Sequence, residues 1–120
     1  MSPSVDGRRI LVVEDSPVVL TYIAEVLDEL GCTIVGPAQN MAIARTLAAD
    51  ESFDAALVDI RIRGEKSFPI CDILAARNIP FILTSGYADW AVPDRWQDSI
   101  QVPKPFKLED LQAALQQVLP

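Results

Sequence analysis

The sequence predicts an α/β fold in which five parallel strands form one doubly wound sheet with helices on both faces. Five short apolar runs alternate with segments whose apolar residues recur at helical spacing. The runs are almost continuously apolar, which is typical of strands buried on both faces of a sheet. Strands that alternate with helices in this way favour a parallel sheet with right-handed crossovers.

The predicted elements follow one another without an internal repeat or linker. Ser16 and Asn40 are good N-cap residues, Pro17 suits the first position of a helix, and Gly31 suits a helix stop. We expect strands at residues 9–13, 32–37, 53–59, 81–84 and 100–102, and helices at 17–30, 41–50, 69–77 and 108–118. Residues 64–67 are expected to form a loop, and residues 87–99, which contain Pro93 and both tryptophans, a less regular segment.

Length and composition indicate one globular domain and exclude several classes of function. We expect residues 1–7 to form a flexible tail and residues 8–120 to form the domain. The net charge of −7 argues against nucleic acid or an anionic membrane as a partner. The chain has no histidine, which excludes histidine acid–base catalysis. Its first residues lack the pattern of a signal peptide, it has no apolar run of about 20 residues, and its two cysteines are expected to be packing residues. We therefore expect a cytoplasmic location.

Polar residues stand where the predicted strands end. Asp59 follows a buried apolar run, where an ionised carboxylate costs several kcal/mol unless something compensates it. Glu14 and Asp15 follow the first strand, Ser85 ends the fourth, and Lys104 follows the fifth. Ligands bind beyond the carboxyl ends of the strands in open α/β sheets, so these side chains are expected to share one crevice.

This set of residue types fits phosphoryl chemistry with a hard metal ion. Three converging carboxylates repel one another and would share protons or recruit a cation, and oxygen-only ligands suit Mg²⁺. A lysine and a hydroxyl on the opposite rim would hold phosphoryl oxygens. Asp59 can then act as a nucleophile toward phosphorus and form an acyl phosphate.

The arrangement resembles the receiver domain of bacterial two-component response regulators over nearly the whole chain. The resemblance implies a flavodoxin-like sheet with strand order 2-1-3-4-5. Residues 64–69, with 79–81 beyond them, are similar to a stand-alone receiver group of alphaproteobacteria. The motifs that carry the family resemblance are Val13-Glu14-Asp15, Val58-Asp59, Thr84-Ser85-Gly86 and Lys104-Pro105-Phe106.

The resemblance implies a role for each residue on the metal side of the crevice. Asp59 would be the phospho-accepting aspartate, and Glu14 and Asp15 would be the acidic pair that holds Mg²⁺. Arg61 stands where the family uses a main-chain carbonyl as a further metal ligand, so its side chain is not required for that role.

It implies roles on the phosphoryl side as well. Ser85 would be the switch hydroxyl, because its distance from Pro80 fits the strand length better than that of Thr84. The amide of Gly86 would bind a phosphoryl oxygen. Lys104 would be the family's lysine, with a cis peptide bond to the following proline.

Three features depart from the family pattern. Gln101 stands at the position of the usual switch aromatic, which puts the usual hydroxyl–aromatic coupling in doubt. The segment from Ser85 to Lys104 is short and contains Pro93, so the fourth helix is expected to be short or remodelled. Arg61 and Tyr87 occupy the rim positions that gate attack by water, and their bulk predicts slow hydrolysis of the acyl phosphate.

We therefore expect a phospho-receiver that takes a phosphoryl group from a phosphohistidine on a sensor kinase or phosphotransfer protein. It would catalyse only its own phosphorylation and dephosphorylation and would switch its affinity for a protein partner. The chain ends after the last helix, so we expect either output by protein contact or a role as an intermediate or sink in a phosphorelay.

Two alternatives stay open. One is a receiver-like interaction module that works without phosphorylation, and the other is a Mg²⁺-dependent aspartyl-phosphate phosphatase. The second is disfavoured because Ile60 and Arg61 follow Asp59, where such enzymes use a second acid, and because no cap-sized insertion exists. The aromatic residues of the Pro93 segment could fill the core or form a docking surface.

Overall fold

The computed structural model describes residues 4–86 and 92–119 and confirms the predicted α/β fold. Its parallel sheet consists of β1 (Arg9–Val13), β2 (Thr33–Ala38), β3 (Ala55–Asp59), β6 (Phe81–Ser85) and β7 (Ile100–Pro103). The strand order β2-β1-β3-β6-β7 equals the expected 2-1-3-4-5, because β4 (Arg61–Ile62) and β5 (Glu65–Lys66) form a separate small hairpin.

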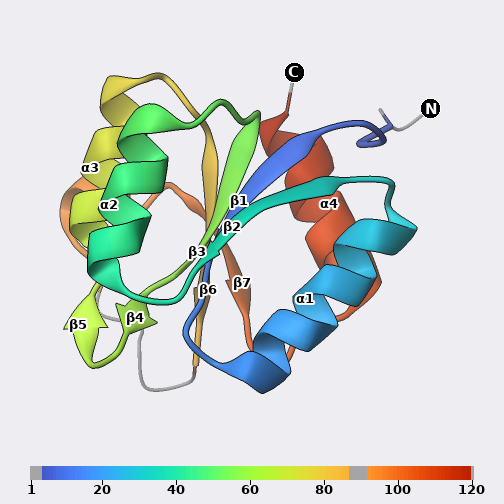
Figure 1. Cartoon of the computed structure of the whole chain (residues 1–120), viewed down its shortest axis with the longest axis horizontal. Helices are drawn as coiled ribbons and strands as arrows, with labels where there is room; N and C mark the ends of the chain where they lie inside the picture. The colour runs from blue at the N-terminus through green and yellow to red at the C-terminus, as the bar shows by residue number, and fades with distance from the viewer. Residues whose placement is uncertain (1–3, 87–91, 120) are drawn as a thin grey trace.

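Two pairs of helices cover the two faces of the sheet (Figure 1). Alternate residues of each strand point to opposite faces, so Leu11 and Val13 pack on one side of β1 and Ile10 and Val12 on the other. One face is covered by α2 (Met41–Asp50) and α3 (Phe68–Ala76), and the other by α1 (Pro17–Glu29) and α4 (Leu108–Val118). The sheet is therefore buried on both faces, as its apolar strands require.

The predicted starts of α1 and α2 are confirmed by capping hydrogen bonds, whereas α3 begins and ends one residue earlier than predicted. Ser16 Oγ accepts from Val19 N at 3.4 Å, and α1 begins at Pro17. The side chain of Asn40 caps α2 in the same way. Gly31, which follows α1, has φ +78, a conformation that glycine adopts without the strain that a Cβ atom brings. No helix within residues 4–86 and 92–119 combines the length and apolarity that crossing a membrane requires.

The segment after β3 differs from the prediction. Residues 64–67 were expected to form a loop, but the chain makes the antiparallel β4–β5 hairpin there. Its two turn residues, Arg63 and Gly64, have φ +49 and +81, as a type I′ turn requires. The prediction missed this hairpin because arginine is unusual at a left-handed turn position.

Two further predicted features differ from the structure: the start of the packed domain and the segment between β6 and β7. The packed part of the chain begins before residue 8, since the side chain of Val5 is buried and its carbonyl accepts a hydrogen bond from Cys32 Sγ. Between β6 and β7, residues 92–99 contain one 3₁₀ turn, η1 (Asp94–Trp96), and no α-helix. Trp96 of this turn is half-buried and packs edge-on against Phe81 at the margin of the core, whereas Trp90 lies outside the described residues.

Candidate functional site

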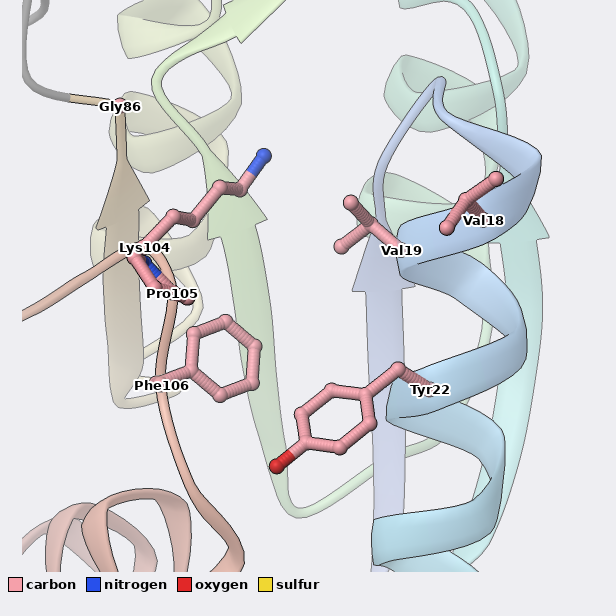
Figure 2. Close-up of a pocket in the computed structure, with 7 residues that line it drawn as sticks. All are labelled: Val18, Val19, Tyr22, Gly86, Lys104, Pro105 and Phe106. Carbon is pink, nitrogen blue, oxygen red and sulfur yellow. The ribbon is translucent and has the colours of Figure 1, made fainter.

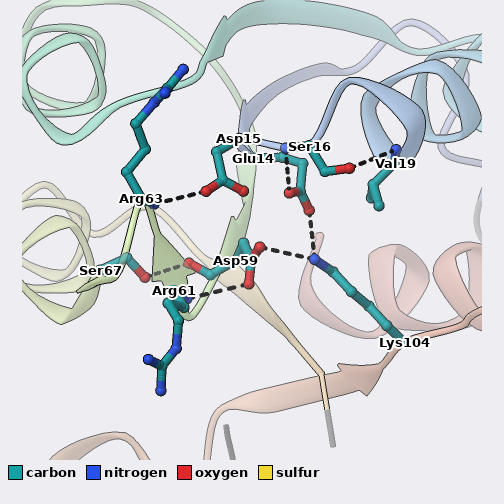
Figure 3. Close-up of polar contacts among 9 residues, drawn as sticks. All are labelled: Glu14, Asp15, Ser16, Val19, Asp59, Arg61, Arg63, Ser67 and Lys104. Atoms are coloured by element: carbon teal, nitrogen blue, oxygen red, sulfur yellow. Dashed lines mark hydrogen bonds and ion pairs between the residues drawn. The ribbon is translucent and has the colours of Figure 1, made fainter. Parts of the chain in front are cut away.

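Three carboxylates meet at the carboxyl edge of the sheet. Asp59 ends β3, and Glu14 and Asp15 follow β1, its neighbour in the sheet. One oxygen from each of the three lies within 4.8 Å of the others (Figure 3). Glu14 and Asp59 are buried, and Asp15 is half-buried. The cluster forms because parallel strands place their carboxyl ends at one edge.

Lys104 compensates this negative charge. Its Nζ atom lies 2.8 Å from Glu14 Oε1 and 2.8 Å from Asp59 Oδ2. The backbone of Lys104 is fixed beside the end of β6, because its N–H donates to the carbonyl of Ser85 at 2.8 Å. This hydrogen bond extends the pairing of β7 with β6. The Lys104–Pro105 peptide bond is cis, as predicted, and Gly36–Pro37 is also cis.

The pKa values of two groups depart from their ordinary ranges. Burial raises the pKa of Glu14; the contact with Lys104 and the amide of Ser16 oppose this rise, and the charge of Asp59 adds to it. Burial alone would lower the pKa of Lys104, but the contacts with Asp59 and Glu14 outweigh it, so that pKa is raised. The lysine is therefore held in its charged form between two acids.

Backbone amides hold one oxygen of each carboxylate. The three hydrogen bonds run from Ser16 N to Glu14 Oε2 (3.0 Å), from Arg63 N to Asp15 Oδ2 (2.7 Å) and from Arg61 N to Asp59 Oδ1 (3.3 Å). Arg63 and the buried Ser67, whose hydroxyl donates to the main-chain carbonyl of Asp59, were not predicted as site residues. Their only sequence signal was the glycine that follows Arg63 in the turn.

The remaining predicted residues lie around this cluster. Thr84 is the strand partner of Asp59 and is buried, whereas Ser85 lies one residue further along at the strand end and is half-buried. Gly86 follows Ser85. Gln101 lies on the edge strand β7, opposite Leu83, and is exposed. The other rim residue, Tyr87, lies outside the described residues.

An apolar pocket of about 620 Å³ opens beside Lys104, between α1 and the chain that follows β7 (Figure 2). The rings of Tyr22 and Phe106 lie 5.8 Å apart in it. Val18, on the first turn of α1, is 80% exposed at its edge. Lys104 lines this pocket and also contacts Glu14 and Asp59, so the pocket and the acidic cluster adjoin at this lysine.

Residues 10–116 match the family described as the response regulator receiver domain. The chain belongs to this family. Among curated proteins, this receiver domain is 33% identical over 119 residues to the transcriptional regulatory protein TcrA of Mycobacterium tuberculosis, covering 92% of this chain and 46% of TcrA. The chain spans about half the length of the curated relatives it matches.

Solved receiver structures are similar over nearly the whole domain. SdrG from Sphingomonas melonis Fr1 is 38% identical, with a TM-score of 0.83 and coverage of 90% of this chain and 92% of SdrG. The receiver domain of the histidine kinase PA1611 from Pseudomonas aeruginosa PAO1 is 30% identical, with a TM-score of 0.79 and coverage of 93% and 97%. That structure is described as having a magnesium ion coordinated in its active-site cleft.

Proposed function

We propose that this receiver domain accepts a phosphoryl group on Asp59 from a phosphohistidine of a donor protein, and that the modification changes its affinity for a protein partner. The observation that carries the proposal is the placement of Asp59. Its carboxylate ends a buried strand, beside two further acids and 2.8 Å from the ammonium group of Lys104.

In the proposed transfer, an oxygen of Asp59 attacks phosphorus. A new O–P bond forms an acyl phosphate as the P–N bond to the donor imidazole breaks, and the electron pair of that bond goes to the nitrogen. A proton taken up from solvent by the other ring nitrogen of the phosphohistidine lets the imidazole leave as the neutral ring. Lys104 would follow the new negative charge and pair with a phosphoryl oxygen. Ser85 and the N–H of Gly86 would supply the other donors, because both lie at the end of the neighbouring strand β6.

The residues at the site fit Mg²⁺. Three carboxylates with oxygens within 4.8 Å of one another supply hard oxygen ligands and no sulfur or imidazole. Glu14, Asp15 and Asp59 would hold the ion, with the main-chain carbonyl of Arg61 as a further ligand. When bound, the ion would neutralise charge on the acceptor and on the incoming phosphoryl group.

We propose that the protein donor rests on the apolar pocket. A donor histidine reaches Asp59 only if the donor covers the acidic cluster, and the pocket adjoins this cluster at Lys104. Val18 and Tyr22 would then become buried on docking, as apolar residues at interface centres are. The donor would be a sensor histidine kinase or a histidine phosphotransfer protein.

Several further proposals follow from this role. The domain would act as a signalling acceptor rather than as an enzyme with an external substrate. It would work in the cytoplasm, where thiols stay reduced, which the two free, buried cysteines support. Output without phosphorylation is the second candidate, favoured by Gln101 at the position where the family carries its switch aromatic.

The test is incubation of the purified protein with acetyl phosphate and Mg²⁺, followed by intact-mass measurement. We expect one added phosphoryl group, stable in acid and labile in base, on the wild type and on Asp28→Asn, an exposed acid of α1 that serves as the matched control. Asp59→Asn should remain unmodified. Equal modification of Asp59→Asn would exclude Asp59 as the acceptor, and no modification of the wild type would favour the interaction module. Catalytic turnover of a small phosphoester would favour the phosphatase.

A further inference from the structure

The β4–β5 hairpin has contacts with the acidic cluster that the proposed phosphotransfer does not itself use. The hairpin follows Asp59 directly, and its tip comes back over the loop after β1 (Figure 3). The backbone N–H of Arg63, at the tip, donates to Asp15 Oδ2 at 2.7 Å, across 48 residues of sequence.

The left-handed turn is what directs this N–H toward Asp15. With φ +49 at Arg63 and +81 at Gly64, the amide of the first turn residue faces the acidic cluster while the arginine side chain points away from it. Arg63 Nε donates to the carbonyl of Gln39 at 3.2 Å, which ties the tip to the segment after β2. The tip is thus fixed on two sides.

The base of the hairpin is fixed as well. Ile62 is fully buried in the core under α2 and α3. Ser67 is fully buried; its hydroxyl donates to the main-chain carbonyl of Asp59, and its N–H donates to the carbonyl of Ile60 at 2.8 Å. A buried carbonyl that lost its donor would carry a desolvation penalty, so these bonds hold the end of β3 and the hairpin together.

We propose that the β4–β5 hairpin positions the metal ligands: the amide of Arg63 orients the Asp15 carboxylate, and Ser67 fixes the strand end that carries Asp59. Arg63 and Ser67 are positioning residues in this proposal, which rests on Mg²⁺ binding at the acidic cluster. A hydrogen bond to one carboxylate oxygen fixes the rotation of the group and directs the other oxygen. Loss of such outer partners typically lowers metal affinity by about 10–100-fold.

The sharpest test alters the turn without touching a ligand. A Cβ atom on Gly64 would meet nothing within 4 Å, so a substitution there acts through the backbone conformation alone. Gly64→Asn keeps a residue that tolerates a positive φ, whereas Gly64→Val places a β-branched residue where it is strained. The two variants form a matched pair of similar surface exposure.

Two readouts separate positioning from stability. Mg²⁺ titration calorimetry should give an affinity about 10-fold weaker for Gly64→Val and within about 2-fold of the wild type for Gly64→Asn. Hydrogen exchange of the Arg63 amide in metal-free protein should be slow in the wild type and in Gly64→Asn, and fast in Gly64→Val. Urea unfolding identifies a variant that has merely lost stability.

Unchanged or tighter Mg²⁺ binding in Gly64→Val would overturn the inference, as would a fast-exchanging Arg63 amide in the wild type. If Gly64→Val fails to fold, Ser67→Ala supplies the same comparison at the base of the hairpin, with wild-type affinity as the overturning result. Wild-type protein that binds no Mg²⁺ overturns both the inference and the proposed metal role. If every variant binds Mg²⁺ and is phosphorylated like the wild type, the positioning inference is wrong, but the proposed phosphotransfer stands.

Discussion

Lys104 Nζ lies 2.8 Å from Asp59 Oδ2, and the two residues are 45 positions apart in the chain. The same ammonium group contacts Glu14 at 2.8 Å, so one lysine bridges two buried acids from two different strand ends. This bridge accounts for how the fold tolerates a buried cluster of carboxylates, and it links stability to the chemistry of the site.

Removal of the bridge should destabilise the metal-free protein. Lys104→Ala leaves Glu14 and Asp59 without their shared cation, and because the lysine is partly exposed we expect a loss of about 2 kcal/mol in the free energy of unfolding. Urea unfolding measures this loss, and Mg²⁺ should recover part of it by supplying positive charge. Arg45→Ala, an exposed position on α2, is the control. Equal stability of Lys104→Ala and the wild type would contradict the prediction.

The raised pKa of Glu14 predicts how stability depends on pH. Because burial raises this pKa above 4.5, the folded state keeps a proton that the unfolded state releases. This proton uptake stabilises the folded state at low pH. The stabilisation is lost as pH rises from about 4.5 through the raised pKa of Glu14. Glu14→Gln cannot titrate, so its metal-free stability should fall less steeply than that of the wild type over this window.

Thermal unfolding at a series of pH values measures the difference in slope. Glu25→Gln, an exposed position on α1, controls for loss of one negative charge and should follow the wild type. Parallel curves for Glu14→Gln and the wild type would show that Glu14 contributes nothing to the pH dependence.

The two thiols should be inert in the folded protein. Burial raises the pKa of Cys71 to about 12 and also raises the pKa of Cys32. At pH 8 the thiolate fraction of Cys71 would be about 10⁻⁴, so Ellman's reagent should react slowly with native protein and rapidly in denaturant. Above pH 9 the unfolded thiols ionise first, so stability should decline with rising pH. Rapid reaction of the native protein would contradict the burial of these thiols.

A charge introduced into the apolar pocket should slow phosphotransfer from a protein donor but not from a small-molecule donor. Val18→Asp places a carboxylate on the most exposed edge of the apolar pocket beside Lys104. We expect phosphotransfer from a phosphorylated histidine phosphotransfer protein of the same organism to slow about 10-fold or more, because the docked charge is desolvated. Phosphorylation by acetyl phosphate should be unchanged. Ile43→Asp, at an exposed position on α2, is the matched control, and equal slowing in both variants would contradict docking at the pocket.

The rim residues predict a long-lived acyl phosphate. Arg61 is exposed two residues after Asp59, where its side chain can obstruct an approaching water molecule. Arg61→Ala should therefore shorten the half-life of the phosphorylated form, measured by loss of the added mass after removal of acetyl phosphate. A half-life of seconds for the phosphorylated wild type would contradict this prediction.

The sequence by itself determined the layers, the strand order expected from the family resemblance, and the edge of the sheet at which to look. The starts of α1 and α2 could be predicted from neighbouring residues alone, because Ser16 and Asn40 cap these helices through hydrogen bonds to residues three positions away. The sequence also predicted that Asp59 lies near the acids after β1, because the carboxyl ends of parallel strands share one edge of the sheet.

Tertiary structure alone decided the contacts that depend on a turn conformation or on the reach of a side chain. The bond from the Arg63 amide to Asp15 requires a left-handed turn at an arginine, which residue preference does not favour. The bridge from Lys104 to both Glu14 and Asp59 depends on where three strands end relative to one another. Such contacts join residues tens of positions apart, and the packing of the sheet fixes their distances.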